Sequence, residues 1–511
     1  MTKKKGRKEV KKADKATSQP DSLSIDKYSF FLNKIPVYVR IYQKKGEFVP
    51  TYETSIPSIS EHTEIILEKI RQELIAEVNV GIGDTFNPRR IQEFETSFRD
   101  VIALLVEKYF PDATPKTREF LTTYLIQRSF GLGNLEILRN DDQLEEIAVN
   151  SPGEPVWVYH MKHGWLKSNL QLRDDDQAKH YASAIGRKVG RQITVLEPLM
   201  DANLASGDRV NATLAPVSLF GNTITLRKFA AKPWTITDFI SQNVLSLDAA
   251  ALIWLSVQYE LSIIIAGGTA SGKTSMLNVV SNFFPPNQRI ISIEDTHELQ
   301  MPKYLHWVPM VTRTPNPEGK GGISMLDLLV NSLRMRPDRI LVGEIRRKAE
   351  AEVLFEAIHT GHSVYATVHA NNAAETINRL TNPPISVPKT LLPAISMILV
   401  QYRNRRTGIR RTFQIAEIEP DATERVLLQY DSAADKLRKV GKSRSLIDVL
   451  KLYTGLSNAR IDADMREKVK VLKWLVKQKI NTVDTVGRVM AEYYTNRKHL
   501  LSVVNSNKQL G

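Results

Sequence analysis

Four short apolar runs stand out in the second half of the chain, because each ends on a glycine-rich turn, an acid or a histidine. They are SIIIAGG, IISIED, RILVGE and VYATVH, in that order. Parallel strands that are buried on both faces read as continuous Val, Ile and Leu runs. In open α/β sheets, ligands bind beyond the carboxyl ends of the strands. The pattern therefore predicts a parallel sheet with one site at the edge where the four runs end.

The rest of the chain divides by its patterning into further regions. Apolar and polar residues alternate between Tyr28 and Pro50 around a Lys-Lys-Gly turn, which predicts a small β-hairpin, and three helical stretches follow it. Strand-like segments around one helix predict a mixed α/β domain before the four runs. The expected order is a disordered basic tail (1–19), a mostly helical module (20–115), an α/β domain (116–230), a linker (231–242), an α/β motor domain (243–428) and a basic helical region (429–511).

Composition narrows the class of protein. The 511 residues include 42% hydrophobic and 25% charged residues, an ordinary globular mixture. The absence of cysteine excludes disulfides and cysteine-ligated zinc, and is typical of a reducing cytosol. No apolar run approaches the ~20 residues that span a bilayer, and the N-terminus lacks the apolar core of a secretory signal. We therefore expect a cytoplasmic protein.

The net charge of +14 arises partly in the N-terminal tail. A tail of this kind is either a solvated end or a contact to an anionic partner, such as a membrane surface or nucleic acid.

The first apolar run leads into GGTASGKT, a full P-loop between a predicted strand and a predicted helix. Glycines let backbone N–H groups surround a β-phosphate, the Lys273 ammonium neutralises phosphate oxygens, and the Thr274 hydroxyl is offered to Mg²⁺. The motif predicts binding of ATP and Mg²⁺. The expected nucleotide-binding residues are Gly267, Gly268, Thr269, Ala270, Ser271, Gly272, Lys273 and Thr274.

Carboxylates follow the second and third runs. Glu294, Asp295 and Glu298 come after one strand, and ATP hydrolysis needs a carboxylate that orients or deprotonates the attacking water. The same acids are also common at helix N-termini. Glu344 ends the third run, at the position of a carboxylate that holds Mg²⁺ through water, although Asp is more usual there.

Three histidines, His359, His362 and His369, flank the fourth run, and we expect them near one another. Their spacing crosses from a loop into a strand and is a poor match to a compact zinc site. Phosphate sensing or polar coupling is the favoured interpretation, with a structural role open for His359.

Taken together and in this order, GGTASGKT, IISIEDTHEL, RMRPDRILVGEIR and TGHSVYATVHANNAAETINRL resemble the Walker A, Asp box, Walker B and His box of one family. It comprises the ATPases of type II and type IV secretion, type IV pili and archaella. The resemblance covers about residues 120–420, and the flanking regions are more like archaeal members. The tetracysteine zinc module of many bacterial type II members is missing.

The resemblance implies a RecA-like motor domain preceded by a PAS-like α/β domain. It also implies a homo-hexameric ring that works, peripherally at the cytoplasmic membrane, under a polytopic membrane platform protein. The residues that match the family's functional positions are the catalytic Glu298, the Walker B Glu344, the box histidines His362 and His369, and the arginines Arg209, Arg227 and Arg334. Arg336 is additional, with an open role.

The sequence therefore predicts an Mg²⁺-dependent ATPase that drives secretion or pilus-like assembly. A nucleic-acid or DNA-transfer motor is the alternative, since it shares the RecA-type core and suits the basic charge. Nucleic acid is the less favoured partner, because such motors place aromatic or basic loops against strands and no such loop is evident. A small-molecule kinase would need an acceptor-binding lid, which is not evident either.

Overall fold

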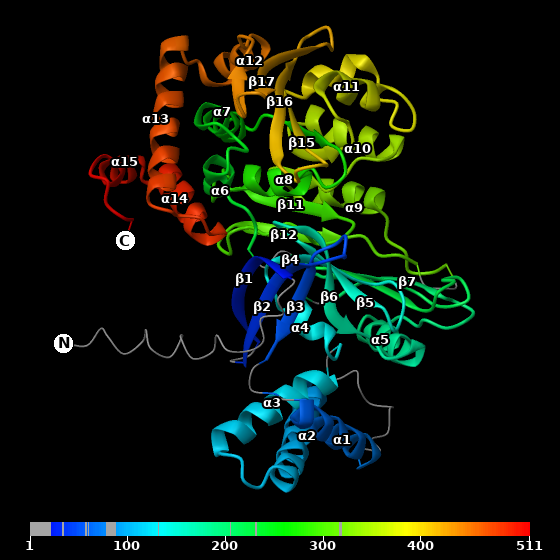
Figure 1. Ribbon diagram of the computed structural model, residues 1–511. Coiled ribbons are helices and arrows are strands. Elements are labelled where there is room, and N and C mark those ends of the chain that lie inside the picture. The colour runs from blue at the N-terminus through cyan, green and yellow to red at the C-terminus, as the bar shows by residue number, and fades with distance from the viewer. Residues whose placement is uncertain are drawn as a thin grey trace, which may run out of the picture. The chain divides into compact units, whose positions relative to one another are not determined.

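The computed structural model describes residues 22–32, 35–56, 59, 61–77, 88–130, 132–204, 206–229, 232–315 and 319–510. The chain divides into two compact units, Met1–Ala230 and Ala231–Gly511, and Figure 1 traces both by residue number. Each unit is built on its own β-sheet. The expected basic tail over 1–19 lies outside the described residues.

The sheet of the first unit runs through two regions that the sequence pattern separates. Its strand order is β1-β2-β3-β6-β5-β4-β9-β8-β7. β1 and β2 form the predicted hairpin, and β3 joins it to the remaining strands through parallel pairing with β6. The strands are β1 (Ser22–Leu32), β2 (Ile35–Lys44), β3 (Thr51–Ser55), β4 (Leu144–Val149), β5 (Pro155–His160), β6 (Gly164–Gln171), β7 (Leu199–Asn203), β8 (Arg209–Thr213) and β9 (Thr223–Arg227).

The expectation of a separate, mostly helical module over 20–115 is corrected by this sheet. Val39 and Ile41 of β2 are buried in the same core as Val158 of β5 and Val210 of β8. The hairpin belongs to the α/β domain because its alternating apolar residues complete that domain's core. Helix α5 (Asp175–Lys188) covers this core, and its first turn is capped by the Asp174 carboxylate, which accepts the Gln177 N–H at 2.8 Å.

The predicted helical stretches after the hairpin are confirmed as three helices, with a short fourth. Leu67, Ile102 and Leu121 from the three helices share a second core with Leu32 and Ile35 of the hairpin. Because α3 packs in this core with α1 and α2, the boundary expected at 115/116 is wrong, and the helical part continues past it. The helices are α1 (Glu61–Glu77), α2 (Pro88–Tyr109), α3 (Pro115–Phe130) and α4 (Leu135–Arg139).

The sheet of the second unit confirms the predicted parallel core. Its order is β12-β11-β13-β14-β10-β15-β16-β17-β18. The pairs from β12 to β15 are parallel, and the remaining pairs are antiparallel. The four apolar runs are the adjacent strands β11, β13, β14 and β10. The strands are β10 (Ile263–Gly267), β11 (Arg289–Glu294), β12 (His306–Val311), β13 (Arg339–Val342), β14 (Ser363–Val368), β15 (Met397–Arg403), β16 (Arg410–Ile418), β17 (Glu424–Asp431) and β18 (Lys436–Lys439).

Helices cover both faces of this sheet, which explains the continuous apolar runs. Along β14, Tyr365 is buried in one core and its neighbours Val364 and Ala366 in another, because successive side chains of a strand point to opposite faces. The first core includes α7 (Leu247–Gln258) and α8 (Lys273–Ser281). The second includes α9 (Met325–Ser332), α10 (Lys348–His359) and α11 (Ala373–Thr381). The expected α/β class, with a parallel sheet covered by helices on both faces, is confirmed.

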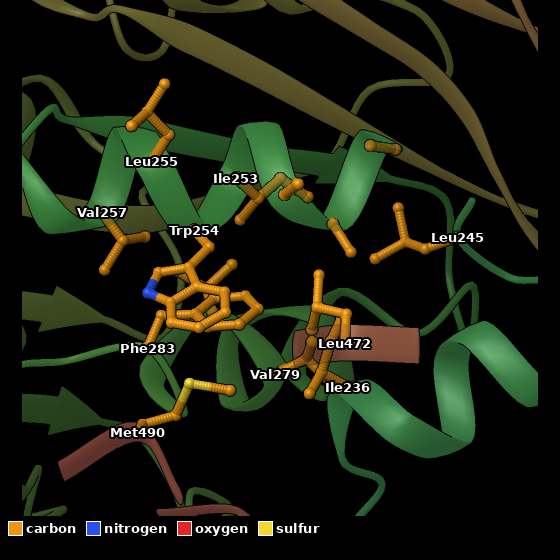
Figure 2. Packing of buried hydrophobic residues seen from close by; sticks show 14 of the residues in the cluster. Ile236, Leu245, Ile253, Trp254, Leu255, Val257, Val279, Phe283, Leu472 and Met490 are labelled. Carbon is orange, nitrogen blue, oxygen red and sulfur yellow. The ribbon is translucent and has the colours of Figure 1, made fainter. Parts of the chain in front are cut away.

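The C-terminal helices are part of the first of these cores. Leu472 of α13 and Met490 of α14 are buried in the same core as Trp254 of α7, whose indole stacks on Phe283 with 5.4 Å between ring centroids (Figure 2). Burying this aromatic pair requires the C-terminal helices. They are α12 (Ser445–Thr454), α13 (Asn458–Lys477), α14 (Val483–Thr495) and α15 (Arg497–Asn505).

Two further boundaries are corrected in the second unit. The expected linker over 231–242 contains α6 (Ile236–Ser241), whose Ile236 and Phe239 are buried in the core with Trp254, so the linker is shorter. The region expected to be helical over 429–511 begins with the end of β17 and with β18. These strands extend the sheet because β17 pairs with β16 and β18 with β17.

Candidate functional site

The P-loop connects the carboxyl end of β10 to the start of α8. Gly267 is closely packed, since a Cβ built there would lie 2.3 Å from the Ser271 Oγ and 2.7 Å from the Gln401 carbonyl oxygen. Gly272 has a φ of +97°, a conformation that side chains disfavour. The Ser271 hydroxyl donates to the Gly268 carbonyl at 2.8 Å. The loop therefore has the compact turn, opening onto a helix N-terminus, that suits a phosphate.

Lys273, the first residue of α8, is held over this loop. Its ammonium donates to the carbonyl oxygens of Gly267 and Gly268 at 3.0 and 3.1 Å, and lies 3.3 Å from the His369 Nδ1. Burial lowers the pKa of Lys273, and the nearby carboxylates of Glu344 and Glu298 act in the opposite direction. The structure thus places Glu344 and Glu298 within electrostatic range of the P-loop cation, as the sequence predicts.

A chain of charged and polar contacts continues from Lys273 across the strand ends. The His369 Nε2 lies 3.2 Å from the Glu344 Oε1. The guanidinium of Arg346 contacts the Glu344 Oε2 at 2.7 Å and the Asp295 Oδ2 at 2.6 Å. Burial, and then the positive charge of Lys273, lower the pKa of His369, so its ring is neutral at pH 7. The ends of β11, β13, β14 and β10 therefore meet in one polar site.

Arg346 was not singled out by the sequence reasoning. It follows Glu344 by two residues, and its contact to Asp295 spans 51 positions of the chain. The hydrogen bond to Glu344 is the first cause of its raised pKa. A guanidinium that bridges two carboxylates fixes the direction of both, so Arg346 orients Glu344. Among the sequence signals, its place in GEIR beside Glu344 could have pointed to it.

Glu294 and Glu298 lie in different environments, although both follow β11. Glu294 is 3% exposed, and its Oε1 accepts the backbone N–H groups of Glu298 and Leu299 at 2.9 and 3.1 Å. Its Oε2 lies 3.2 Å from the His297 Nδ1, and this contact raises the pKa of His297. Glu294 therefore holds the turn that carries Glu298, whereas Glu298 is only half-buried.

The expectation that the three histidines lie near one another is wrong. His359 ends α10, His362 precedes β14, and His369 follows the other end of that strand. A six-residue strand separates its two ends by roughly 20 Å. The His362 Nδ1 lies 3.0 Å from both the Ala357 carbonyl oxygen and the Thr360 Oγ1, at the end of α10. Only His369 reaches the P-loop.

The predicted arginines fall into two groups. Arg334 lies in the second unit but away from the P-loop, and Arg209 and Arg227 belong to the first unit. Arg334 lies in a single 3-10 turn before the amino end of β13, whereas Glu344 follows its carboxyl end. Arg336 is nearby with a φ of +53°. Arg209 and Arg227 are directly opposite each other on β8 and β9 of the first unit. The roles of Arg334 and His362 stay predictions.

Among the residues that the structure describes, no group of three or more His, Cys, Asp or Glu side chains is arranged to hold a metal ion. Likewise, no helix within the described ranges is long and apolar enough to cross a membrane.

Comparisons with known proteins place this site in a family. The family described as Type II/IV secretion system protein matches residues 132–423. An uncharacterized protein of Methanocaldococcus jannaschii is 32% identical over 480 residues, which are 92% of this chain and 82% of that protein. A putative conjugal transfer protein of Mycobacterium tuberculosis is 32% identical over 299 residues, or 56% of this chain and 84% of that protein.

Among solved structures, the ATPase DotB of Legionella pneumophila is 20% identical, with a TM-score of 0.39, and the match covers 73% of this chain and 95% of DotB. The family match spans more than half of the chain and includes every motif of the site. The chain therefore belongs to the family of type II/IV secretion system proteins.

Proposed function

We propose that the chain is an Mg²⁺-dependent ATPase that works as a homo-hexamer. It converts ATP hydrolysis into movement of a polytopic membrane platform protein, for protein secretion or for assembly of a type IV pilus-like filament. The observation that carries this proposal is the chain of contacts from Lys273 of the P-loop through His369 to Glu344, at the edge where parallel strands end. Family membership supports the same function.

The residues at this edge fit a nucleoside triphosphate with Mg²⁺. The close packing at Gly267 leaves the loop backbone, rather than side chains, to face a phosphate. Lys273 would neutralise the β- and γ-phosphate oxygens, and Thr274 and Glu344 would hold the metal. Bound Mg²⁺ would stabilise charge on the transferred phosphoryl group.

Within this scheme, Glu298 accepts the proton of the attacking water. Glu294 holds the Glu298 backbone in place through its hydrogen bond. His369 contributes a neutral ring between the P-loop cation and the Walker B acid, where it responds to the phosphate that Lys273 binds. Arg346 keeps Glu344 directed toward this position.

Two measurements on the purified full chain test the proposal. ATP turnover with Mg²⁺ should be abolished by excess EDTA, and mass photometry with ATP should give particles of six times the mass of one chain. A chain that binds no nucleotide contradicts the enzymatic part of the proposal. A chain that hydrolyses ATP but stays monomeric at micromolar concentration contradicts the hexamer alone.

Coupling of ATP to motion is proposed to use Arg209 and Arg227 of the first unit. A guanidinium holds phosphate oxygens in a fork and keeps its charge, so closure of the two units on ATP would follow from these contacts. Arg227 also lies opposite Glu146 on the neighbouring strand. A pair between these two side chains would give Arg227 a purely structural role instead. Arg209→Ala and Arg227→Ala should each lower turnover and abolish ATP-dependent closure measured by a distance label. Variants that close and hydrolyse like the wild type would exclude this coupling.

A DNA-transfer motor is the second candidate, favoured by the similarity to a putative conjugal transfer protein and by the net charge of +14. Protein contacts to phosphates make binding steeply salt-dependent. Stimulation of ATP turnover by single-stranded DNA, lost as salt rises from about 50 to 200 mM, would favour this candidate over protein export.

A further inference from the structure

The hairpin between β15 and β16 carries a concentration of arginines that the sequence reasoning left unexplained. Arg403, the last residue of β15, and Arg410, the first residue of β16, are direct cross-strand partners. Like charges placed directly opposite each other in an antiparallel pair are destabilising. Arg411 is neutralised by the Asp435 carboxylate, with contacts of 2.6 and 2.7 Å. The arginines of this segment are Arg403, Arg405, Arg406, Arg410 and Arg411.

The register of the sheet brings this hairpin to the P-loop. β15 pairs in parallel with β10, and Gln401 is the partner of Gly267, the first residue of the P-loop. Gln401 is tied in turn to β16, because its side-chain amide donates to the Thr412 Oγ1 at 3.1 Å in the interior. The two strands therefore leave the sheet at the same edge, and the basic turn after Arg403 begins beside the loop.

Arg410 makes a direct contact with the P-loop backbone. Its Nε donates to the Ala270 carbonyl oxygen at 3.1 Å. Ala270 has a φ of +57°, an unfavourable conformation for a residue with a Cβ. A Cβ added at Gly272 would lie 3.9 Å from the Arg410 Cδ, so the side chain of Arg410 runs along the outer side of the loop.

We infer that Arg410 is a positioning residue of the nucleotide site, which fixes the outer half of the P-loop and adds a second positive charge beside Lys273. This inference rests on the proposed function and deepens it. The carbonyl and N–H of a trans peptide point in opposite directions. Holding the Ala270 carbonyl toward the hairpin therefore sets the direction of the Ser271 N–H, which lies inside the loop, 3.3 Å from the Gly268 carbonyl oxygen.

A charged donor suits this role better than a neutral one. Hydrogen bonds from an ionised group are shorter and stronger than neutral ones, and a positive charge at the rim of a phosphate site attracts the anion before the loop binds it.

Arg405 is a matched control on the same hairpin. It is exposed in the turn between the strands, where Asn404 organises the backbone by accepting the N–H groups of Arg406 and Thr407 at 2.9 and 3.1 Å. Arg405→Ala removes the same charge and the same side chain as Arg410→Ala, without the contact to Ala270.

The test measures binding of a fluorescent ATP analogue and steady-state ATP turnover for the full chain and for Arg410→Ala, Arg410→Lys, Arg410→Gln and Arg405→Ala. Loss of a hydrogen bond to a charged group lowers affinity by about tenfold or more. Arg410→Ala should therefore raise both the Kd and the KM for ATP about tenfold, with kcat changed much less. Arg410→Lys should recover more affinity than Arg410→Gln, and Arg405→Ala should bind like the wild type.

Equal nucleotide affinities for Arg410→Ala and Arg405→Ala would overturn the inference. So would a fall in kcat at unchanged Kd and KM, because a positioning residue of the loop acts on binding. If Arg410→Ala fails to fold, Arg410→Lys and Arg410→Gln are compared instead. Equal nucleotide affinities of these two variants would exclude a role for the charge. A wild type that binds no nucleotide overturns the proposed function itself, whereas normal wild-type binding with unaffected variants overturns the role of Arg410 alone.

Discussion

Two clusters of charged and polar side chains in the second unit have similar chemistry and different access to solvent. The nucleotide-site cluster consists of Lys273, Asp295, Glu344, Arg346 and His369, and the C-terminal cluster of Asp464, Glu467, Lys468, Tyr493 and Arg497. In the first, the side chains of Glu344 and Arg346 are 19% and 58% exposed. In the second, those of Lys468 and Asp464 are 0% and 9% exposed.

The C-terminal cluster has its partners inside the protein. The Lys468 ammonium donates to the Asp464 Oδ2 at 2.7 Å and to the Tyr493 hydroxyl at 3.3 Å, and lies 5.4 Å from the centre of the Trp254 ring. The contacts join α13 and α14 to α7. Removing one member of such a pair leaves a buried charge uncompensated. The cluster therefore secures the C-terminal helices.

The nucleotide-site cluster pairs its charges where a ligand can reach them. Glu344 and His369 contact each other and remain partly open to solvent. Exchange of these internal partners for phosphate or metal costs little desolvation, since the groups are already hydrated. Burial therefore decides whether a paired charge supports the fold or the chemistry. Substitutions in one cluster at a time test this difference.

The largest expected effect is on catalysis at Glu298. Glu298→Gln should lower ATP turnover by about a hundredfold to ten thousandfold, the usual contribution of a general base, because an amide cannot accept the proton. Nucleotide binding and thermal stability should not change. Turnover is measured beside Glu356→Gln, an exposed acid of α10. Unchanged turnover would move the role to Glu294.

Lys273→Ala should act on the same cluster through binding as well as turnover. Loss of the ammonium should lower kcat/KM by about a hundredfold to a thousandfold, comparable to the loss of one transition-state donor. The midpoint of thermal unfolding should stay near that of the wild type, because the contacts of Lys273 are to the P-loop and the site. A midpoint of thermal unfolding as low as that of Lys468→Met would contradict the difference between the two clusters.

Lys468→Met should instead reduce stability and leave the nucleotide site intact. It removes the ammonium partner of Asp464, which keeps the Arg497 guanidinium at 2.9 Å. The free energy of unfolding should therefore fall by less than about 3–5 kcal/mol, the cost of a fully uncompensated buried charge. Chemical denaturation measures this, with the exposed Lys473→Met of the same helix as the control. Replacing Asp464 by Leu in addition should recover part of the loss. A Lys468 variant as stable as the control would show that the cluster contributes nothing.

The smallest expected effect is a pH dependence of stability. Burial lowers the pKa of Lys468 from 10.5 to about 8, against the opposing effect of Asp464. Between these values the unfolded chain binds more protons than the folded one, so this residue's contribution to stability rises with pH. The gain is at most about 1.4 kcal/mol per pH unit.

The measurement is the stability difference between the wild type and Lys468→Met from pH 7 to pH 9.5. Above about pH 8, the free energy of unfolding of the wild type should rise relative to that of Lys468→Met. Burial also raises the pKa of Tyr493, which opposes this trend only above the ordinary range of tyrosine near pH 10. A difference that stays constant with pH would contradict a lowered pKa of Lys468 in the folded state.

Much of the fold was readable from local patterns. The runs that became β10, β11, β13 and β14 are apolar on both faces, and such runs are buried wherever they lie. The P-loop is equally local, because its glycines, lysine and threonine act within eight consecutive residues. By contrast, the hairpin was assigned to the helical module and not to the α/β domain, because strand β3 pairs with the distant β6 and no local pattern records such a pairing.

By itself, the sequence determined that a phosphate-binding turn follows a buried strand and that acids end its neighbouring strands, since backbone conformation and burial depend on nearby residues. Only the tertiary structure decided which of these groups meet. Strand order placed His369 beside Lys273 and left His362 at the other end of β14, and it brought Arg346 to Asp295 and Arg410 to the P-loop. Contacts between side chains fall off within a few ångströms, so they depend on the packing of distant segments and not on their spacing along the chain.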